Sequence, residues 1–165
     1  MKVYILRHAP AVPRGTVAYA HDDRPLTDEG RKKMSKASKA LAELAKDVEV
    51  ILTSPLIRAH DTAEIAARAL GMEDKLEICK ELAPGMVTSE LLSALGKYKS
   101  FSSILVVGHE PDLGYLASAL LGSTTSVIEL KKGAICCIEV SSLPPKKPGT
   151  LIWHLPPRML RNLKT

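Results

Sequence analysis

The chain has 165 residues, of which 45% are hydrophobic, so it is long enough for one domain with a sizeable core and short for two. Aromatic residues make up only 4% of it, which disfavours the stacking surfaces that bind single-stranded nucleic acid. The net charge is +5, but seven basic residues and a single acidic one follow residue 130, and the first 130 residues carry −1. We interpret this basic C-terminal region as solvated surface, with an anionic protein partner left open.

Targeting signals and metal-binding cysteine patterns are missing from the sequence. It enters a strand-like segment directly and contains neither a signal segment nor a run of about eighteen apolar residues. We therefore expect a cytoplasmic protein that does not insert into a membrane. Cys79, Cys136 and Cys137 are an odd number, and neighbours in a strand point to opposite faces. We expect them to be reduced and structural, without a disulfide or a zinc role.

Strand and helix signals alternate along the first half of the chain. Residues 3–7 form an apolar, β-prone run, and a loop rich in Gly, Pro and charge follows over 10–25. A connection of this length indicates a functional loop. Thr27 then begins a helix with apolar residues at helical spacing. A second buried strand over 48–53 ends at Ser54-Pro55, which predicts a helix with Ser as N-cap and Pro at its first position.

The second half of the chain continues the alternation and then changes to strands. A tight Lys131-Lys132-Gly133 turn indicates a hairpin near the C-terminus. The predicted elements are, in order, a short strand over 76–78, a helix over 88–98, a central strand over 104–107, a helix over 111–121, and strands over 125–130, 134–140 and 150–155.

This order predicts a single domain over 1–165 of the α/β class, a three-layer α/β/α sandwich. The central sheet is expected to be mostly parallel, with an antiparallel part near the C-terminus. The strands over 3–7, 48–53 and 104–107 all end in polar residues. Parallel strands present those ends on one edge of the sheet, which is where open α/β sheets bind their ligands.

Four side chains are predicted to converge at this edge. Arg7 and His8 follow the first strand, and His109 follows the central one. Arg58 falls in the first turn of its helix, and helical side chains lean back toward the N-terminus. Two guanidinium groups and helix N-termini form a strong trap for a tetrahedral dianion. The pattern therefore indicates phosphate chemistry.

Histidine adds reactivity to such a trap. A neutral His8 can attack phosphorus and form a covalent phosphohistidine that water then cleaves. Arg7, Arg58 and a protonated His109 would hold the phosphoryl oxygens as charge redistributes. The acidic residues show no metal-ligand spacing, so we expect neither a metal nor another cofactor. The remaining histidines, His21, His60 and His154, have no matching partners and are not expected to be catalytic.

Several motifs together resemble those of the histidine phosphatase superfamily, also called phosphoglycerate-mutase-like. They are Arg7-His8 after the first strand, Thr53-Ser54-Pro55 followed by Arg58-Ala59 and Thr62, and Gly108-His109-Glu110-Pro111. The short chain, Arg24-Pro25-Leu26-Thr27 with Gly30, Glu81-Leu82-Ala83-Pro84 and Trp153 are most similar to its small SixA-type branch of phosphohistidine phosphatases. The resemblance spans nearly the whole chain.

The resemblance implies His8 as the phosphorylated nucleophile, with Arg7, Arg58 and His109 as the phosphate pocket, and a metal-independent reaction. Ala9 stands where the superfamily usually has Gly, and its methyl group narrows the approach beside the nucleophile. Glu81 matches the position where many members carry their catalytic acid. Its alternative role is to brace the loop, and Asp22 and Asp23 are further acids in the 10–25 loop.

The leading substrate hypothesis is phosphohistidine in a protein, such as a His-containing phosphotransfer domain. A short chain with few insertions leaves the pocket open to a protruding side chain, whereas small metabolites are usually enclosed. Arg24 is a candidate for positioning the phosphate or the partner, with a salt bridge within the loop as its alternative. The runner-up is a phosphomonoesterase acting on a small phosphorylated metabolite. A non-catalytic phosphate- or nucleic-acid-binding module is disfavoured because binding alone needs no nucleophile.

Overall fold

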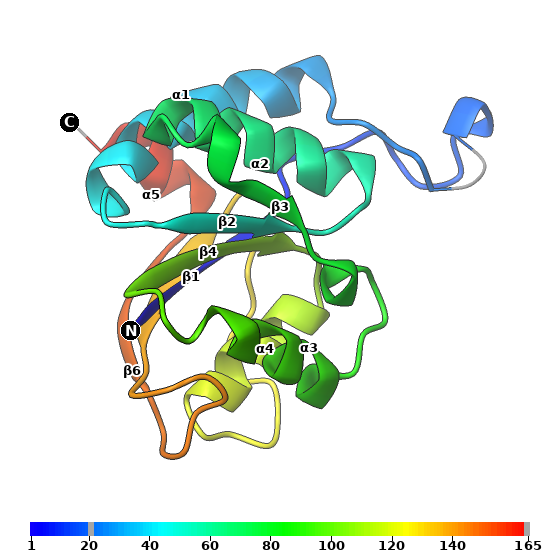
Figure 1. Cartoon of the computed structure of the whole chain (residues 1–165). Coiled ribbons are helices and arrows are strands. Elements are labelled where there is room, and N and C mark those ends of the chain that lie inside the picture. The colour runs from blue at the N-terminus through cyan, green and yellow to red at the C-terminus, as the bar shows by residue number, and fades with distance from the viewer. Residues whose placement is uncertain (20–21, 164–165) are drawn as a thin grey trace.

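In the computed structural model, which describes residues 1–19 and 22–163, these residues form a six-stranded sheet with helices on both faces (Figure 1). The strand order is β3-β2-β4-β1-β5-β6. The strands are β1 (Lys2–Arg7), β2 (Val50–Thr53), β3 (Leu76–Ile78), β4 (Ser103–Gly108), β5 (Ile135–Glu139) and β6 (Thr150–Leu155). The helices are α1 (Asp28–Leu44), α2 (Ile57–Leu70), α3 (Thr88–Leu95), α4 (Asp112–Leu120) and α5 (Pro157–Asn162).

The sheet is parallel over four strands and antiparallel at one side. β1 and β2 both pair in parallel with β4, and β3 pairs in parallel with β2. β5 runs antiparallel to β1, and β6 runs antiparallel to β5. The predicted α/β fold and its mostly parallel sheet with an antiparallel C-terminal part are confirmed.

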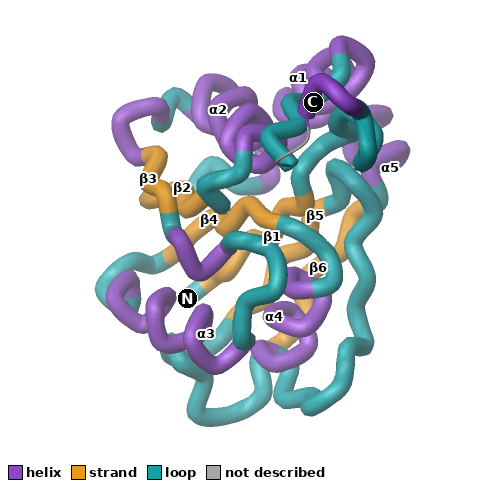
Figure 2. The backbone as a smooth tube through the Cα atoms, turned by 90° about the vertical axis from the view of Figure 1, so that its right-hand side faces the viewer, coloured by secondary structure: helices purple, strands orange, loops and turns teal. Residues whose placement is uncertain are grey.

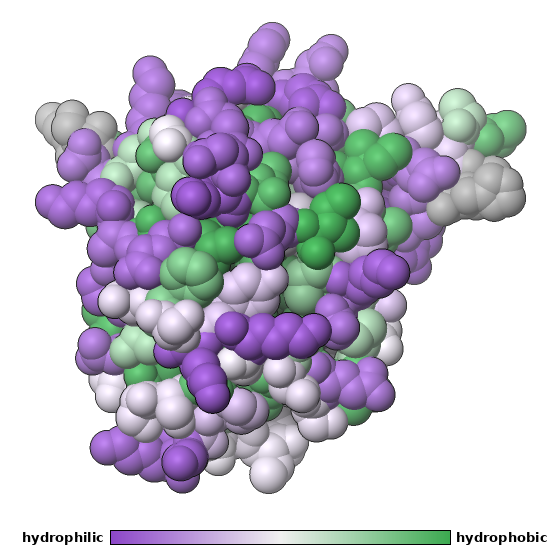
Figure 3. Space-filling view, in the orientation of Figure 1, coloured by the Kyte–Doolittle hydropathy of each residue, from purple (hydrophilic) through white to green (hydrophobic). Residues whose placement is uncertain are grey.

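Two apolar clusters fill the space between the sheet and its helices. Tyr4 and Leu6 of β1 pack into the cluster beneath α1, α2 and α5, whereas Val3 and Ile5 pack into the one beneath α3 and α4 (Figure 1). This alternation follows from the two-residue period of a strand. The outward surface over α1 is mostly hydrophilic, whereas apolar residues also show around α2, where Ile57 is exposed (Figure 3). Among the described residues, no helix combines the length and apolar character needed to cross a membrane.

The neighbouring cysteines of β5 point to opposite faces, as predicted. Cys136 belongs to one apolar cluster and Cys137 to the other. Both are buried free thiols, and so is Cys79. Burial raises the pKa of Cys136 to about 12, which keeps its thiol protonated and unreactive at neutral pH.

The start of α2 differs from the prediction. Its N-cap is Leu56 and its first residue is Ile57, so Ser54 and Pro55 precede the helix. The Ser54 hydroxyl accepts a hydrogen bond from the Leu56 backbone N–H at 3.3 Å and lies 2.8 Å from Nε2 of His109. Ser54 therefore holds the turn before α2 and contacts a predicted site residue. Arg58 still lies in the first turn of the helix, as expected.

The predicted strand over 125–130 is wrong. β5 pairs with β1 and β6, and the segment forms no ladder. Side chains satisfy its backbone instead: the Ser118 hydroxyl accepts from the N–H groups of Val127 and Ile128, and the Glu110 carboxylate accepts from that of Leu130. Although its apolar residues alternate as in a strand, the segment is irregular, and its backbone N–H groups bond to polar side chains instead of to a neighbouring strand.

The C-terminal end also differs from the prediction, because β6 is followed by helix α5. Pro157 occupies a first-turn position of α5, where its missing N–H costs nothing, and Leu160 is buried against α1. The expected helix over 88–98 is an α-helix to Leu95 and then a 3-10 turn over Gly96–Tyr98.

The N-terminus of α1 approaches the chain segment that follows His8. Thr27 caps the helix by accepting from the Gly30 N–H, as predicted, and its own N–H donates to the Pro10 carbonyl at 3.2 Å. A Cβ atom at Gly30 would lie 1.9 Å from that same carbonyl oxygen. Position 30 therefore tolerates no side chain without displacement of the backbone two residues after His8.

We expect Gly30→Ala to destabilise the protein by about 1 to 3 kcal/mol, because the added methyl group must push Pro10 away from α1. Urea unfolding measures this change. Lys36→Ala, at an exposed position of the same helix, is the control and should leave the free energy of unfolding within about 0.5 kcal/mol. Equal stability of the two variants would contradict the close approach.

Candidate active site

The parallel register brings the two predicted catalytic histidines together. Arg7 pairs with Gly108 at the ends of β1 and β4, so His8 and His109 are the first residues after the two strands. The His8 backbone N–H donates to the Gly108 carbonyl at 3.0 Å, which extends the pairing to the nucleophile itself. The imidazole centroids lie 5.2 Å apart. Figure 2 views the molecule from the side on which these strands end.

A cavity of about 250 Å³ opens at this edge of the sheet. The structure brings together five of the six predicted site residues there, since only Glu81 is missing from its walls. Glu110 is the single acidic side chain among the described lining residues, beside five cationic ones. The lining residues are Arg7, His8, Pro13, Arg14, Arg24, Arg58, Pro84, His109, Glu110 and Lys132.

His8 is held as a neutral imidazole with one free nitrogen. Its Nδ1 lies 2.8 Å from the Ala9 carbonyl oxygen, which can only accept, so Nδ1 carries the proton and Nε2 keeps its lone pair. The side chain is buried, and burial lowers its pKa to about 4, helped by the positive charges of Arg58, Arg7 and Lys132. Neutral His8 is the form that a nucleophilic role requires.

His109 is also neutral in this structure, which differs from the protonated form expected from the sequence. Burial lowers its pKa to about 3, and the neighbouring His8 and Arg58 lower it further. Its Nε2 pairs with the Ser54 hydroxyl, while its buried Nδ1 has no hydrogen-bond partner. Nδ1 is therefore a buried polar atom left unpaired on a residue that lines the cavity. A bound dianion would oppose the cationic contribution and favour protonation of the ring.

The two guanidinium groups are each fixed by backbone and leave donors unused. Nη1 of Arg7 donates to the Leu130 carbonyl at 2.7 Å, and Nη1 of Arg58 donates to the Asp22 carbonyl at 3.1 Å. The Nε atoms of both arginines are buried without a partner. Unpaired buried donors on two converging guanidinium groups are what an anion site offers before it is filled.

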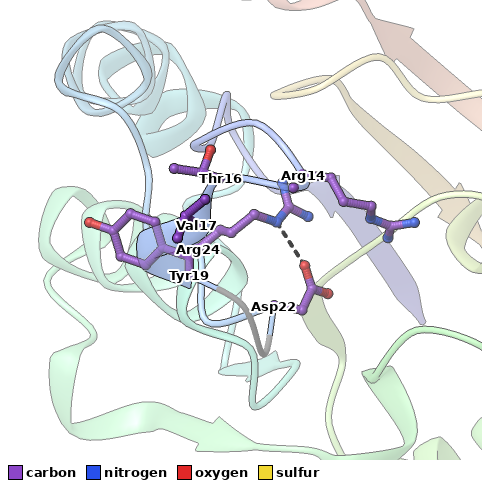
Figure 4. A pocket seen from close by; sticks show the side chains of 7 residues that line it. Arg14, Thr16, Val17, Tyr19, Asp22 and Arg24 are labelled. Carbon is purple, nitrogen blue, oxygen red and sulfur yellow. Dashed lines mark hydrogen bonds and ion pairs between the residues drawn. The ribbon is translucent and has the colours of Figure 1, made fainter.

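Asp22 supplies the negative charge opposite Arg58. Its Oδ2 accepts from Nη2 of Arg58 at 3.1 Å, and its Oδ1 accepts from Nε of Arg24 at 2.7 Å (Figure 4). Although burial opposes it, the two guanidinium groups lower the pKa of Asp22 below its usual value. Asp22 adopts a positive φ of 64°, an uncommon conformation for a residue other than glycine. The carboxylate thus occupies donors that a phosphoryl group would use.

Arg24 therefore takes part in a salt bridge within the loop and also lines the cavity. A second hollow of about 520 Å³ adjoins this loop, and Arg14 and Arg24 line both spaces. Figure 4 shows Asp22 facing Arg24, while the Arg14 side chain extends away from Tyr19.

Glu81 lies outside the cavity. It belongs to the 3-10 turn Lys80–Leu82, and its carboxylate accepts from the Cys79 thiol at 3.4 Å. Pro84 is the residue of this segment that lines the cavity. The predicted role of Glu81 as proton donor finds no contact to support it in this geometry and stays a prediction.

Two further histidines, His60 and His154, are not part of the cavity wall. His60 lies on α2 with its Nδ1 3.6 Å from the Glu64 carboxylate, and His154 lies on β6 opposite Cys136. His21 falls outside the described residues. Asp23, the neighbour of Asp22, is exposed and makes no ion pair with another described residue.

Three residues that line the cavity were not predicted as site residues from the sequence. Lys132 was interpreted as solvated surface with the rest of the basic C-terminal region; it is exposed, and it also lines the cavity. Its turn is tied to the nucleophile, since the Gly133 N–H lies 3.1 Å from the carbonyl oxygens of both Arg7 and His8. Arg14 had only its place in the 10–25 loop as a signal. Glu110 was visible in the Gly108-His109-Glu110-Pro111 motif.

Over residues 1–19 and 22–163, no three His, Cys, Asp or Glu side chains are grouped as a metal ion would require. The cations around the cavity instead suit direct binding of an anion.

The sequence and fold have relatives with this arrangement. A family model described as the histidine phosphatase superfamily, branch 1, matches residues 3–83. The chain is 29% identical to the phosphohistidine phosphatase SixA of Escherichia coli (strain K12) over 169 residues, with 99% of both chains covered. The chain belongs to the histidine phosphatase superfamily. The prediction that the protein is a phosphatase is thereby confirmed.

Further similarities extend over most of the chain. An uncharacterized protein of Picosynechococcus sp. is 39% identical over 140 residues, which are 82% of each chain. A structure of the protein histidine phosphatase SixA complexed with tungstate superimposes with a TM-score of 0.83 at 27% identity, covering 96% of this chain and 98% of that one. A SixA structure from Agrobacterium tumefaciens, described as a putative phosphohistidine phosphatase, gives 0.76 at 20% identity and supports the fold alone.

The depressed pKa values of His8 and His109 predict acid sensitivity of this histidine phosphatase. In the unfolded chain both rings bind protons below about pH 6.5, whereas in the folded protein they stay neutral down to about pH 4 and 3. Stability should therefore fall as the pH drops from 6.5 toward 4, by about 1 to 2 kcal/mol per histidine between pH 6.5 and 5. Urea unfolding of the wild type and of His109→Asn measures this loss, which should be smaller in the variant. An identical pH dependence would contradict the buried neutral state.

The contacts of Asp22 predict that it competes with anions. Asp22→Asn should tighten competitive inhibition by inorganic phosphate about fivefold, because a charge worth about 1 kcal/mol at such a distance is removed from the Arg58 donors. Asp23→Asn, the exposed neighbour, is the matched control and should leave the inhibition constant unchanged. Weaker inhibition in Asp22→Asn would show instead that the carboxylate holds the arginines in place for the ligand.

Proposed function

We propose that this enzyme removes the phosphoryl group from phosphohistidine in a protein, through a covalent phosphohistidine on His8. The observation that supports this most is the free Nε2 of a neutral imidazole inside a cavity lined by Arg7 and Arg58. A site built for binding alone would need the arginines but no nucleophile.

In the first step, the phosphoryl group binds to the unused donors of Arg7 and Arg58 and displaces Asp22 from Arg58. Nε2 of His8 forms a bond to phosphorus while the bond from phosphorus to the leaving nitrogen breaks. The substrate ring, protonated on its other nitrogen, keeps that electron pair and departs as neutral imidazole. Nδ1 of His8 becomes more acidic as the ring gains positive character, and its bond to the Ala9 carbonyl stabilises that charge.

In the second step, water attacks the phosphorus of phosphorylated His8. The bond from phosphorus to Nε2 breaks, orthophosphate leaves, and the imidazole returns to its neutral form. The low pKa of His8 favours this neutral form, so no external base is needed to deprotonate the ring. No step of this proposal uses a metal ion.

Phosphohistidine suits this cavity because its leaving group needs little help. An imidazole departs with a pKa of about 6.5, far below that of an alkoxide, so general-acid assistance contributes little. Among the described lining residues the one carboxylate is Glu110, which accepts from the Leu130 backbone N–H, and Glu81 lies outside. The relatives named SixA are phosphohistidine phosphatases by name, which supports the same substrate class.

The nucleophile is tested by trapping. We expect a slow phosphoryl donor such as phosphoramidate to leave an acid-labile phosphate on the wild-type protein, and His8→Ala to show neither label nor turnover. His60→Ala, which removes a histidine of α2 outside the cavity, should be labelled like the wild type. Labelling that persists in His8→Ala would overturn the mechanism.

The substrate class is tested by turnover of a phosphohistidine protein, phosphoramidate and a panel of phosphate monoesters, with His8→Ala as the blank. We expect kcat/KM to be highest for the phosphohistidine protein. A small monoester turned over faster would favour a metabolite phosphatase instead. Glu81→Gln belongs in the same comparison: a loss confined to monoesters would identify Glu81 as a proton donor, and equal activity on both classes would exclude that role.

A further inference from the structure

Glu110 and Arg7 bind the backbone of the same residue, Leu130, one at its N–H and the other at its carbonyl. Oε1 of Glu110 accepts from the Leu130 backbone N–H at 2.7 Å, and Nη1 of Arg7 donates to the Leu130 carbonyl at 2.7 Å. These are short contacts to charged partners, which make the stronger kind of hydrogen bond. Leu130 itself is fully buried, so water does not compete for these two hydrogen bonds from the side of the Leu130 side chain.

The segment that carries Leu130 depends on such contacts. It has no regular secondary structure between α4 and β5, so no ladder fixes its position. Ser118 holds Val127 and Ile128 near its start, and Glu110 holds Leu130 near its end. Glu110 therefore helps to fix the backbone of Leu130, whose carbonyl accepts the hydrogen bond from Nη1 of Arg7.

The hold on Nη1 decides which way the Arg7 fork points. A guanidinium is planar and rigid, so fixing one terminal nitrogen fixes the edge formed by the others. Nε on this group is buried and unpaired, and Arg7 lines the cavity. We propose that Glu110 is a positioning residue for phosphoryl binding, acting on Arg7 through the backbone of Leu130. This inference rests on the proposed role of Arg7 in binding the phosphoryl group.

Glu110 is a poor candidate for the proton donor although it lines the cavity. Burial raises the pKa of Glu110 above its usual value, but Oε1 is already engaged as the acceptor of the Leu130 backbone N–H. A Cβ at Gly114 would lie 2.9 Å from Oε2, so the absence of a side chain there lets the carboxylate sit against α4. Both oxygens therefore face backbone rather than a leaving group.

The proposal is tested with a double-mutant cycle on Arg7 and Glu110, using the full chain and inorganic vanadate as the ligand. We expect Glu110→Ala to weaken vanadate binding about tenfold when Arg7 is present and less than twofold in the Arg7→Ala background, because the effect passes through Arg7. Glu110→Gln keeps one oxygen for the Leu130 N–H and should recover most of the loss. Additive losses in the two backgrounds would overturn the proposal.

A matched control separates positioning from loosening of the segment. Ser118→Ala removes the contacts to Val127 and Ile128 but leaves Leu130 bonded to Glu110, and it should change vanadate affinity less than twofold. A tenfold loss in Ser118→Ala as well would overturn the specific link to Arg7. Because vanadate binding needs no turnover, failure of the phosphohistidine assignment would leave this cycle intact. Conversely, additive losses here would leave the trapping of phosphate on His8 unaffected.

Discussion

The pairing of β1 with β4 sets the chemistry of this enzyme, because a backbone register determines where the two histidines lie. With Arg7 opposite Gly108, the residues that follow must be neighbours, and the bond from the His8 N–H to Gly108 extends the ladder to the point where the chain leaves the sheet. A slip of one residue would turn His8 to the other face of the strand. Both strands are completely buried over their apolar residues, so such a slip would also exchange side chains between the two apolar clusters and disrupt the packing of both.

Burial then divides the titratable groups of the cavity into two kinds. An imidazole loses its proton when it is taken out of water among positive charges, whereas a guanidinium keeps its charge through any plausible shift. The same desolvated environment therefore yields a neutral nucleophile and charged phosphate ligands side by side. Asp22 offsets part of the charge of Arg58 and Arg24, and a bound phosphoryl group would displace its carboxylate from Arg58.

Strand ends and motif spacing were enough to predict His8, Arg7, Arg58 and His109 at one edge of the sheet, because each follows directly from a buried strand or a helix start. Lys132 and Glu110 were harder. Lys132 reaches the cavity because β5 pairs with β1, a long-range choice that the local hairpin signal around Gly133 obscured. Glu110 matters through a segment whose apolar alternation predicted a strand, and only the contacts of Leu130 show what replaced it.

The positive charge that remains in the cavity affects how substrates reach the site. A phosphoryl dianion that engages Arg7 and Arg58 leaves Arg14 and Lys132 on the wall without an ion pair to a described acidic residue. Uncompensated cations in a concave, low-dielectric surface raise the local concentration of anions and speed their encounter. They also penalise a cationic group beside the phosphoryl group. The cavity therefore selects first for negative charge near the phosphorus, and the geometry at His8 Nε2 then decides which of those anions can react.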